Sequence, residues 1–416
     1  MKKNILLLML CCCFCINVSL KAQSFNDYFI NRTLRLDYIF SGTANQQAVS
    51  VEALSQLSSW AGRRHHLSEL PVDGNGQITI NDLKSGTCIY KTSFSTLFQE
   101  WLDTDEARNT ARGFENTFLV PYPKQPIEIS VSFRDKKGIY NTLLKHVVNP
   151  GDILIKKLED THTTPYIYLQ KSGSPENCID VAILAEGYTK EEMELFLKDA
   201  KIACESLFAH EPFRSMKDRF NIVAVESPSK DSGVSAPKNG IWKNTAFSSH
   251  FDSFYSDRYL TSSNLTDIHN ALAGIPYEHI IILANTEQYG GGGIYNSFTL
   301  TTAHHEHFRP VVVHEFGHSF AGLADEYYYD KDLFNGIYPF DVEPWEQNIT
   351  TRVNFPAKWK DMVEKGTAKL VEGGGYSSKN IYRGADDCRM KTNTCPGFCP
   401  VCQRAIKRMI DFYTLP

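Results

Sequence analysis

The sequence predicts an α+β chain with an N-terminal antiparallel β-sandwich and a C-terminal α/β module, whose mixed, largely parallel sheet is flanked by helices. Short runs of alternating apolar and polar residues fill the first third of the chain. After Asp180, apolar strands alternate with longer helical stretches. The 416 residues are 42% hydrophobic and 22% charged, which is globular composition for two or three domains.

Residues 1–22 have the layout of a secretory signal peptide. Two lysines precede an apolar run over residues 5–18, and the expected cleavage site follows a small residue, Ala22. The run is shorter than the ~20 residues of a membrane helix, and no later run is longer. We therefore expect an exported protein without a transmembrane segment, periplasmic, at the cell surface or secreted. Four cysteines in the run raise a lipid anchor as the alternative, but the small residues that precede a lipidated cysteine are missing.

The charge balance bears on the partner class. Without residues 1–22 the chain has 40 basic and 48 acidic residues, a formal charge of −8. An acidic surface of this kind argues against nucleic acid or an anionic membrane as partner.

Residues 23–150 form the expected β-sandwich. Alternating runs at 77–80, 88–94 and 127–133 are separated by turn residues, as in antiparallel sandwiches. Pro-Gly and Gly-Ser-Pro sequences bracket residues 151–177, which we expect to be a linker.

Residues 178–416 form the expected α/β module. Apolar strands at 181–185, 220–225 and 279–284 are separated by helical stretches from residue 189 to about 208 and near 264–273. Strand, helix and strand at this spacing predict a largely parallel sheet.

The sequence from Val311 to Glu326 carries the main chemical signal. In a helix, His314 and His318 stand on one face about 5–6 Å apart, so both imidazoles can bind one metal ion. Glu315 lies beside them, where it can take a proton from a metal-bound water. Gly322 can end the helix and turn the chain back, which brings Asp325 in as a third ligand and leaves one zinc position open for water.

Two other interpretations use the same residues. In the first, a core helix holds two histidines that are merely hydrogen-bonded. In the second, residues 317–322 form a strand-to-helix elbow that presents Ser319 as the nucleophile of a serine hydrolase. That elbow needs glycine where Ala321 stands, and it leaves Glu315 without a role.

Three segments together resemble one family. They are His-Glu-Phe-Gly-His-Ser-Phe-Ala-Gly-Leu-Ala-Asp-Glu-Tyr from residue 314, Tyr-Gly-Gly-Gly-Gly-Ile-Tyr-Asn-Ser from residue 289, and Phe-Cys-Pro-Val-Cys from residue 398. The sequence resembles the bacterial IgA-peptidase family of zinc metallopeptidases, which are zincins with a Met-turn. The resemblance covers residues 178–416, and the β-sandwich resembles the family's accessory N-terminal domain. It implies a secreted endopeptidase with one catalytic Zn²⁺.

The third ligand departs from the pattern of related zincins. Their glycine comes three residues after the second histidine, and a histidine ligand follows three residues later. Here the glycine comes one residue later and Asp325 replaces the histidine, with Glu326 as the alternative ligand. If Asp325 binds, Glu326 is expected to hydrogen-bond a ligand or cap nearby backbone. Met390 is the expected Met-turn residue, an apolar platform beneath the zinc.

The last four cysteines suggest a covalent clamp around the Met-turn. Cys388, Cys395, Cys399 and Cys402 contain only one Cys-x-x-Cys pair, whereas a zinc ribbon needs two. The context of a thioredoxin-like redox site is also missing. We expect two disulfides, with the pairing open.

The glycine-rich segment before the helix is the expected substrate strand. Zincins place an edge strand here that pairs with extended substrate, and the candidates are Gly291, Gly292, Gly293, Ile294 and Tyr295. For stabilising the oxyanion, Tyr376, Tyr382 and Arg383 remain open alternatives.

The sequence thus predicts a zinc endopeptidase acting on a protein or peptide, with a host glycoprotein or an immunoglobulin as candidate substrates. The rival from another class is a non-catalytic surface protein that binds host protein or glycan through a degenerate zincin domain. An intact Glu315 speaks against that rival, because a pure binder has no use for this carboxylate. The sequence leaves the oligomeric state open.

Overall fold

The computed structural model describes residues 24–158, 163–329 and 337–416. The expected signal peptide, residues 1–22, lies outside the described residues. Within the described ranges, no helix has the length and apolar character needed to cross a bilayer.

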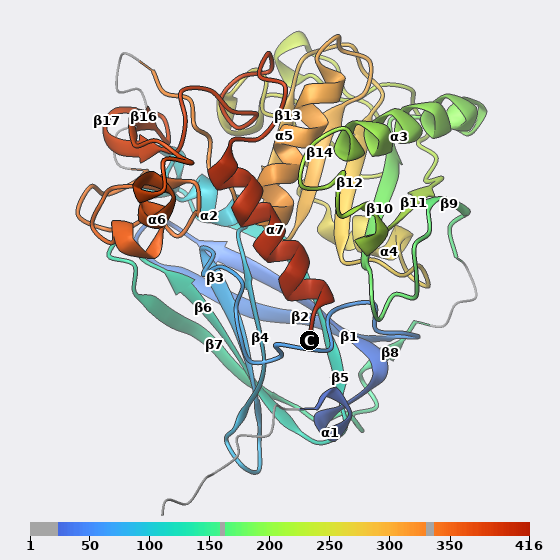
Figure 1. Cartoon of the computed structure of the whole chain (residues 1–416). Coiled ribbons are helices and arrows are strands. Elements are labelled where there is room, and N and C mark those ends of the chain that lie inside the picture. The colour runs from blue at the N-terminus through green and yellow to red at the C-terminus, as the bar shows by residue number, and fades with distance from the viewer. Residues whose placement is uncertain (1–23, 159–162, 330–336) are drawn as a thin grey trace, which may run out of the picture.

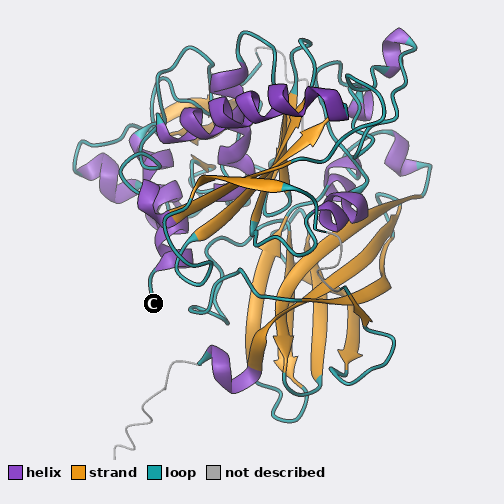
Figure 2. Ribbon diagram, turned by 90° about the vertical axis from the view of Figure 1, so that its right-hand side faces the viewer, coloured by secondary structure: helices purple, strands orange, loops and turns teal. Residues whose placement is uncertain are grey.

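The N-terminal module is a sandwich of two four-stranded sheets, as predicted (Figure 2). Both sheets are antiparallel except where β8 (Lys156–Lys157) runs parallel to β2 (Gln47–Leu57). The first sheet has the order β5-β1-β2-β8, made of Arg112–Pro123, Phe29–Gly42, Gln47–Leu57 and Lys156–Lys157. The second has the order β4-β3-β6-β7, made of Cys88–Phe94, Gly76–Asp82, Ile127–Arg134 and Tyr140–Val148.

The C-terminal module is built on a six-stranded mixed sheet, which confirms the predicted class. Its order is β13-β14-β12-β10-β11-β9, made of Gly291–Ile294, Phe298–Thr302, His279–Ala284, Ile179–Glu186, Phe220–Val225 and Tyr166–Gln170. The four central strands are parallel, and the two edge strands, β13 and β9, are antiparallel to their neighbours. The segment 151–177, expected as a linker, contributes β8 to the first sandwich sheet and β9 to this sheet.

The central strand β10 shows how the mixed sheet is covered on both faces. All eight of its residues are buried, as expected for a parallel strand between two layers. Val181 and Ile183 pack with the helices α3 (Met193–Phe208), α5 (Phe308–Ala321) and α7 (Pro400–Thr414). Ala182 and Leu184 face the opposite layer, which contains α4 (Leu265–Ala271) and the β-sandwich (Figure 1).

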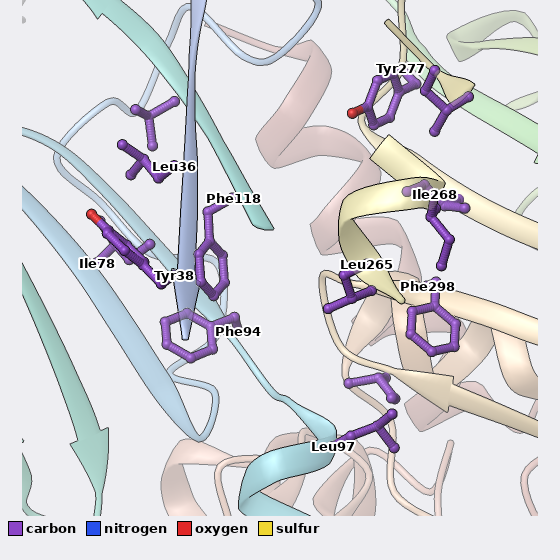
Figure 3. Close-up of a cluster of buried hydrophobic side chains, with 14 of the residues drawn as sticks. Leu36, Tyr38, Ile78, Phe94, Leu97, Phe118, Leu265, Ile268, Tyr277 and Phe298 are labelled. Carbon is purple, nitrogen blue, oxygen red and sulfur yellow. The ribbon is translucent and has the colours of Figure 1, made fainter. Parts of the chain in front are cut away.

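One hydrophobic core runs without interruption from the sandwich into this second layer. Tyr38, Phe94 and Phe118 of the sandwich belong to the same buried cluster as Leu265 and Phe298 of the C-terminal module (Figure 3). The two modules therefore bury apolar surface against each other, which is the main stabilising contribution to their contact.

Smaller elements complete the chain. A three-stranded sheet of order β15-β17-β16 precedes α7, and its strands are Ile349–Thr350, Ser377–Arg383 and Val371–Gly374. The short helices are α1 (Phe25–Tyr28), α2 (Leu97–Trp101) and α6 (Lys360–Glu364). Between β17 and α7 lies the loop that carries Met390.

Candidate active site

Helix α5 brings the three residues of the predicted motif to one place. It ends at Ala321, and Gly322 takes the left-handed conformation with φ of 58°, as the sequence predicts for a chain that turns back. The side chains of His314 and His318 are 13% and 15% exposed, so both reach the surface of a cleft from a largely buried helix.

Both imidazoles are oriented by backbone carbonyls on the far side of each ring. His314 Nδ1 donates to the carbonyl oxygen of Arg389 at 2.9 Å, and His318 Nδ1 donates to that of Leu323 at 2.5 Å. Because a carbonyl can only accept, the Nδ1 atoms carry the hydrogens and a neutral ring presents its Nε2 lone pair to the cleft.

The turn after α5 brings Asp325 to these two lone pairs. The Nε2 atoms lie 3.0 Å apart, and Asp325 Oδ1 lies 3.0 Å from His314 Nε2 and 3.3 Å from His318 Nε2. Three atoms with lone pairs at this spacing repel one another unless a proton or a metal ion lies between them. Zinc with bonds of about 2.0–2.1 Å separates tetrahedral ligand atoms by about 3.3 Å, so the donor set fits a zinc ion.

The electrostatics of this triad also favour a positive charge at its centre. Burial alone would lower the pKa of His318, but the Asp325 carboxylate outweighs it and raises that pKa to about 9. Burial opposes ionisation of Asp325, yet the charge of a protonated His318 and the closeness of both imidazoles hold its pKa below the usual range. Asp325 is therefore an anion facing two imidazoles.

Asp325 and Glu326 diverge after the turn. Asp325 faces the cleft, and its second oxygen, Oδ2, accepts a hydrogen bond of 2.5 Å from Tyr376 Oη. Glu326 faces away into the protein interior, where Asn348 Nδ2 donates to its Oε1 at 3.0 Å. The geometry therefore brings Asp325, rather than Glu326, to the two histidines.

Glu315 lines the cleft beside the histidines. Burial raises the pKa of its carboxyl, while the charges of His314 and His318 oppose that rise. A carboxylate oxygen of Glu315 lies within 4.8 Å of a nitrogen of each imidazole. Asp325 is closer to both rings, so Glu315 is left to face a water molecule or substrate in the cleft.

Met390 lies directly against α5. It is fully buried, and a Cβ built on Gly317 would lie 2.8 Å from its sulfur. Gly317 immediately precedes His318, so the Met390 side chain packs on the helix surface between the two histidine positions. The role of Met390 as a Met-turn platform stays a prediction.

The cleft has a volume of about 1560 Å³ and is lined by both modules. The sandwich contributes Glu100 from α2, and Tyr259 of the C-terminal module donates a hydrogen bond to its Oε2. Burial raises the pKa of Glu100 to about 7. Sequence reasoning missed Glu100, Tyr259 and Arg258, because no motif marks them and the fold alone brings them to α5.

The expected substrate strand, β13, is the edge strand of the mixed sheet. Gly291 N donates to the Arg258 carbonyl at 3.3 Å, and Tyr295 O accepts from Ser95 N at 3.0 Å. Because alternate residues face the same side of a strand edge, the Gly293 N–H and C=O face outward between these two contacts. Tyr295 itself is buried, with its Oη 3.2 Å from Ser93 Oγ of the sandwich.

The glycines of β13 are required by the protein's own packing. A Cβ at Gly293 would lie 2.2 Å from the Glu315 carbonyl oxygen, and one at Gly291 would lie 3.0 Å from Glu315 Oε1. Helix α5 thus packs directly on the strand backbone. The sequence analysis assigned this segment only to pairing with substrate and did not predict the packing of α5 on it.

Among the three open oxyanion candidates, only Tyr376 lines the cleft. Arg383 donates to the carbonyl oxygens of Glu372 and Gly373, away from the histidines. Tyr382 lies in β17 beneath the Arg352 guanidinium.

The serine-hydrolase alternative is wrong. Residues 308–321 form a continuous helix, so the strand-to-helix elbow does not exist. Ser319 is 3% exposed, and its Oγ lies 2.6 Å from Thr299 Oγ1 inside the protein. It is absent from the cleft lining.

The four cysteines near the Met-turn do not form disulfides in this structure. Cys388, Cys395, Cys399 and Cys402 all have free thiols. Cys388 Sγ lies 3.7 Å from Cys402 Sγ, while Cys395 bonds the Gly397 carbonyl. The structure therefore does not show the two predicted disulfides.

A mixed sheet and a helix whose His-Glu-x-x-His residues line a cleft are typical of zinc metallopeptidases. Residues 167–371 match the family model described as IgA Peptidase M64, and residues 24–145 match the model described as Peptidase M64 N-terminus. The chain belongs to the IgA peptidase M64 family. No curated protein matches the chain.

Proposed function

We propose that this chain is an exported, zinc-dependent endopeptidase. The observation that carries the proposal is the convergence of His314 Nε2, His318 Nε2 and Asp325 Oδ1 at 3.0–3.3 Å from one another in the cleft. These three residues would hold a zinc ion. When bound, the ion supplies a Lewis acid that polarises the scissile carbonyl and lowers the pKa of the attacking water.

The chain's own residues supply the proton transfers. Glu315 accepts the proton of the attacking water as general base and delivers it to the leaving amine as general acid. Its raised pKa supports this double role, because a carboxyl that holds a proton more readily can return it to the product.

The edge strand β13 and the sandwich align the substrate. The outward-facing N–H and C=O of Gly293 can pair with one residue of an extended substrate chain. Glu100 of the sandwich, which accepts a hydrogen bond from Tyr259 of the C-terminal module, forms part of the cleft wall. The substrate class is protein or peptide, and immunoglobulin or another host glycoprotein is the candidate to test first.

The test compares wild-type protein with Glu315→Gln on a proteome-derived peptide library, with cleavage sites determined by mass spectrometry. We expect chelator-sensitive cleavage by the wild type and a loss of at least about two orders of magnitude in kcat/KM for the variant. Zinc content and melting temperature should stay at wild-type values, because Glu315 is not one of the proposed ligands. Glu306→Gln, at an exposed glutamate outside the cleft, is the matched control. Full turnover in Glu315→Gln would refute the assignment.

A further inference from the structure

Directly behind the candidate active site lies a second group of potential metal ligands. Glu326, Cys388, Cys399 and Cys402 are each at most 5% exposed, and one ligand atom from each lies within 4.8 Å of those of the others. None of them lines the cleft. Cys388 and the pair Cys399–Cys402 lie beyond residue 371, where the match to the family model ends.

The distances within this group are those of a tetrahedral site. Cys388 Sγ and Cys402 Sγ are 3.7 Å apart, whereas a disulfide needs about 2.05 Å. Zinc–sulfur bonds of about 2.3 Å place two tetrahedral sulfur ligands about 3.8 Å apart. Glu326 Oε1 lies 3.0 Å from Cys402 Sγ and 3.9 Å from Cys399 Sγ. These values bracket the separation of about 3.5 Å expected between sulfur and oxygen ligands of one zinc ion.

Glu326 is an independent sign that a cation belongs here. Its side chain is fully buried, and within the described part of the chain its Oε2 atom has no hydrogen-bond partner. Buried carboxylates are normally paired or coordinate a metal, because an unpaired one loses several kcal/mol of hydration. Its Oε1 atom accepts from Asn348 and contacts the thiols of Cys399 and Cys402, which are weak donors.

The local backbone also favours thiolates. Cys399 is the N-cap of α7, and Cys402 lies in the first turn of that helix, where the helix dipole stabilises negative charge. The backbone N–H of Cys399 donates to Cys388 Sγ at 3.1 Å. Arg383, which is 4% exposed, supplies a positive charge that acts on Glu326.

We propose that Glu326, Cys388, Cys399 and Cys402 bind a structural zinc ion, distinct from the catalytic one. Three sulfur ligands favour Zn²⁺, Cu⁺ or an iron–sulfur cluster, and the carboxylate oxygen favours Zn²⁺ among these. Binding releases the three thiol protons and leaves no open position for water, as in other structural zinc sites.

The ion would connect three segments that build the active site. Glu326 follows Asp325, and Cys388 precedes Arg389 and Met390. Glu326 N donates to the Met390 carbonyl at 2.8 Å, and the Arg389 carbonyl orients His314. The structural zinc would therefore fix the Asp325 loop, the Met390 loop and the N-terminus of α7 relative to one another.

The first test replaces the bound metal of the chain from Gln23 to Pro416 with Co²⁺. Thiolate ligation of cobalt gives a sulfur-to-metal charge-transfer band in the near ultraviolet, whereas two imidazoles and a carboxylate give none. We expect this band in the wild type, and two equivalents of zinc per chain before substitution. The double variant His314→Ala/His318→Ala should keep the band and one equivalent, so the structural site can be scored even if the proposed catalytic site is wrong.

Ligand variants locate the site. Cys399→Ser and Glu326→Gln should each lower the zinc content from two equivalents to one, and Cys399→Ser should abolish the band. Cys395→Ser is the matched control, because Cys395 lies in the same loop but bonds the Gly397 carbonyl. It should keep both equivalents and the band.

Two results would overturn the proposal. One is a wild-type protein without the cobalt–thiolate band. The other is a Cys388–Cys402 disulfide found by peptide mapping under non-reducing conditions. Both measurements use the wild type, so they decide the question even if a ligand variant fails to fold.

Discussion

At the scale of single residues, Asp325 is held from two sides. Its Oδ1 faces the two imidazoles, and its Oδ2 accepts a hydrogen bond from the hydroxyl of Tyr376. A hydrogen bond to the second oxygen fixes the rotation of a carboxylate, so that the first oxygen stays aimed at its ligand position. Tyr376 thus acts on the site through Asp325.

Tyr376→Phe should weaken zinc binding by about 10–100-fold, because such supporting contacts contribute that much to metal affinity. Competition with a chromogenic chelator measures the affinity, and kcat/KM should fall in parallel. Tyr382→Phe is the control, because Tyr382 lies outside the cleft. Equal zinc affinities for the two variants would contradict this role.

Glu100 gives the cleft wall a dependence on pH. Burial raises its pKa from 4.5 to about 7, so the folded protein holds a proton that the unfolded chain releases. A raised carboxyl pKa contributes stability below about pH 4.5 that is lost as the pH rises through about 7. At 1.36 kcal/mol per pKa unit, this shift corresponds to at most about 3 kcal/mol in the free energy of unfolding.

Glu100→Gln should therefore stabilise the protein at pH 8 relative to the wild type, and the gain should shrink toward pH 5. Glutamine keeps a side-chain oxygen that can accept the hydrogen bond from the Tyr259 hydroxyl. Urea unfolding at the two pH values measures the difference. Glu364→Gln, at an exposed glutamate, should show no such trend. A pH-independent gain in Glu100→Gln would count against burial as the cause.

At the scale of elements, the sequence predicts those helices, strands and helix ends that depend on local patterns of residues. The helix carrying His314 and His318, its end at Gly322 and the buried strands follow from periodicity and from glycine conformation. The contact between Tyr259 and Glu100 could not be predicted, because it joins distant parts of the chain without a motif. The sequence analysis predicted disulfides from the cysteines alone. It could not show that Glu326 lies beside Cys402, because only the fold brings these two residues together.

Adding one methyl group to β13 tests whether the close contact between β13 and α5 is required. Gly293→Ala would place a Cβ 2.2 Å from the Glu315 carbonyl oxygen, so the strand or the helix must move. We expect a loss of about 1–3 kcal/mol in stability and a fall in kcat/KM, since Glu315 shifts with its backbone. Chemical denaturation and peptide hydrolysis measure the two effects.

Gly113→Ala in β5 is the matched control for this substitution. The nearest atom to its added Cβ is Ile39 Cγ2 at 3.5 Å, an ordinary contact. It should keep wild-type kcat/KM. If the two alanine variants behave alike, the close approach of α5 to β13 is not what the active site requires.

At the scale of the whole molecule, the shared core couples the two modules. Phe118 and Val131 of the sandwich lie in one buried cluster with Leu184, Phe298 and Leu300 of the mixed sheet. Separating the modules would expose this apolar surface to water. The sandwich is thus part of the folding unit that carries the active site.

The chain from Gln23 to Pro416 should therefore unfold in one calorimetric transition, with a van't Hoff enthalpy close to the calorimetric one. A fragment spanning residues 163–416, which keeps all six strands of the mixed sheet, should aggregate or bind a hydrophobic dye, because it lacks the sandwich side of the core. Two resolved transitions in the full chain would show that the modules unfold independently.

A shared core also bears on how this peptidase survives its own activity. Proteolysis of folded proteins proceeds through partly opened forms, whose population depends on the free energy of opening. When neither module can open without exposing the core of the other, partial opening costs nearly as much as global unfolding. Self-digestion within the two modules is then limited by complete unfolding. We therefore expect the packing of the sandwich to make the protein resistant to self-digestion even at high concentration.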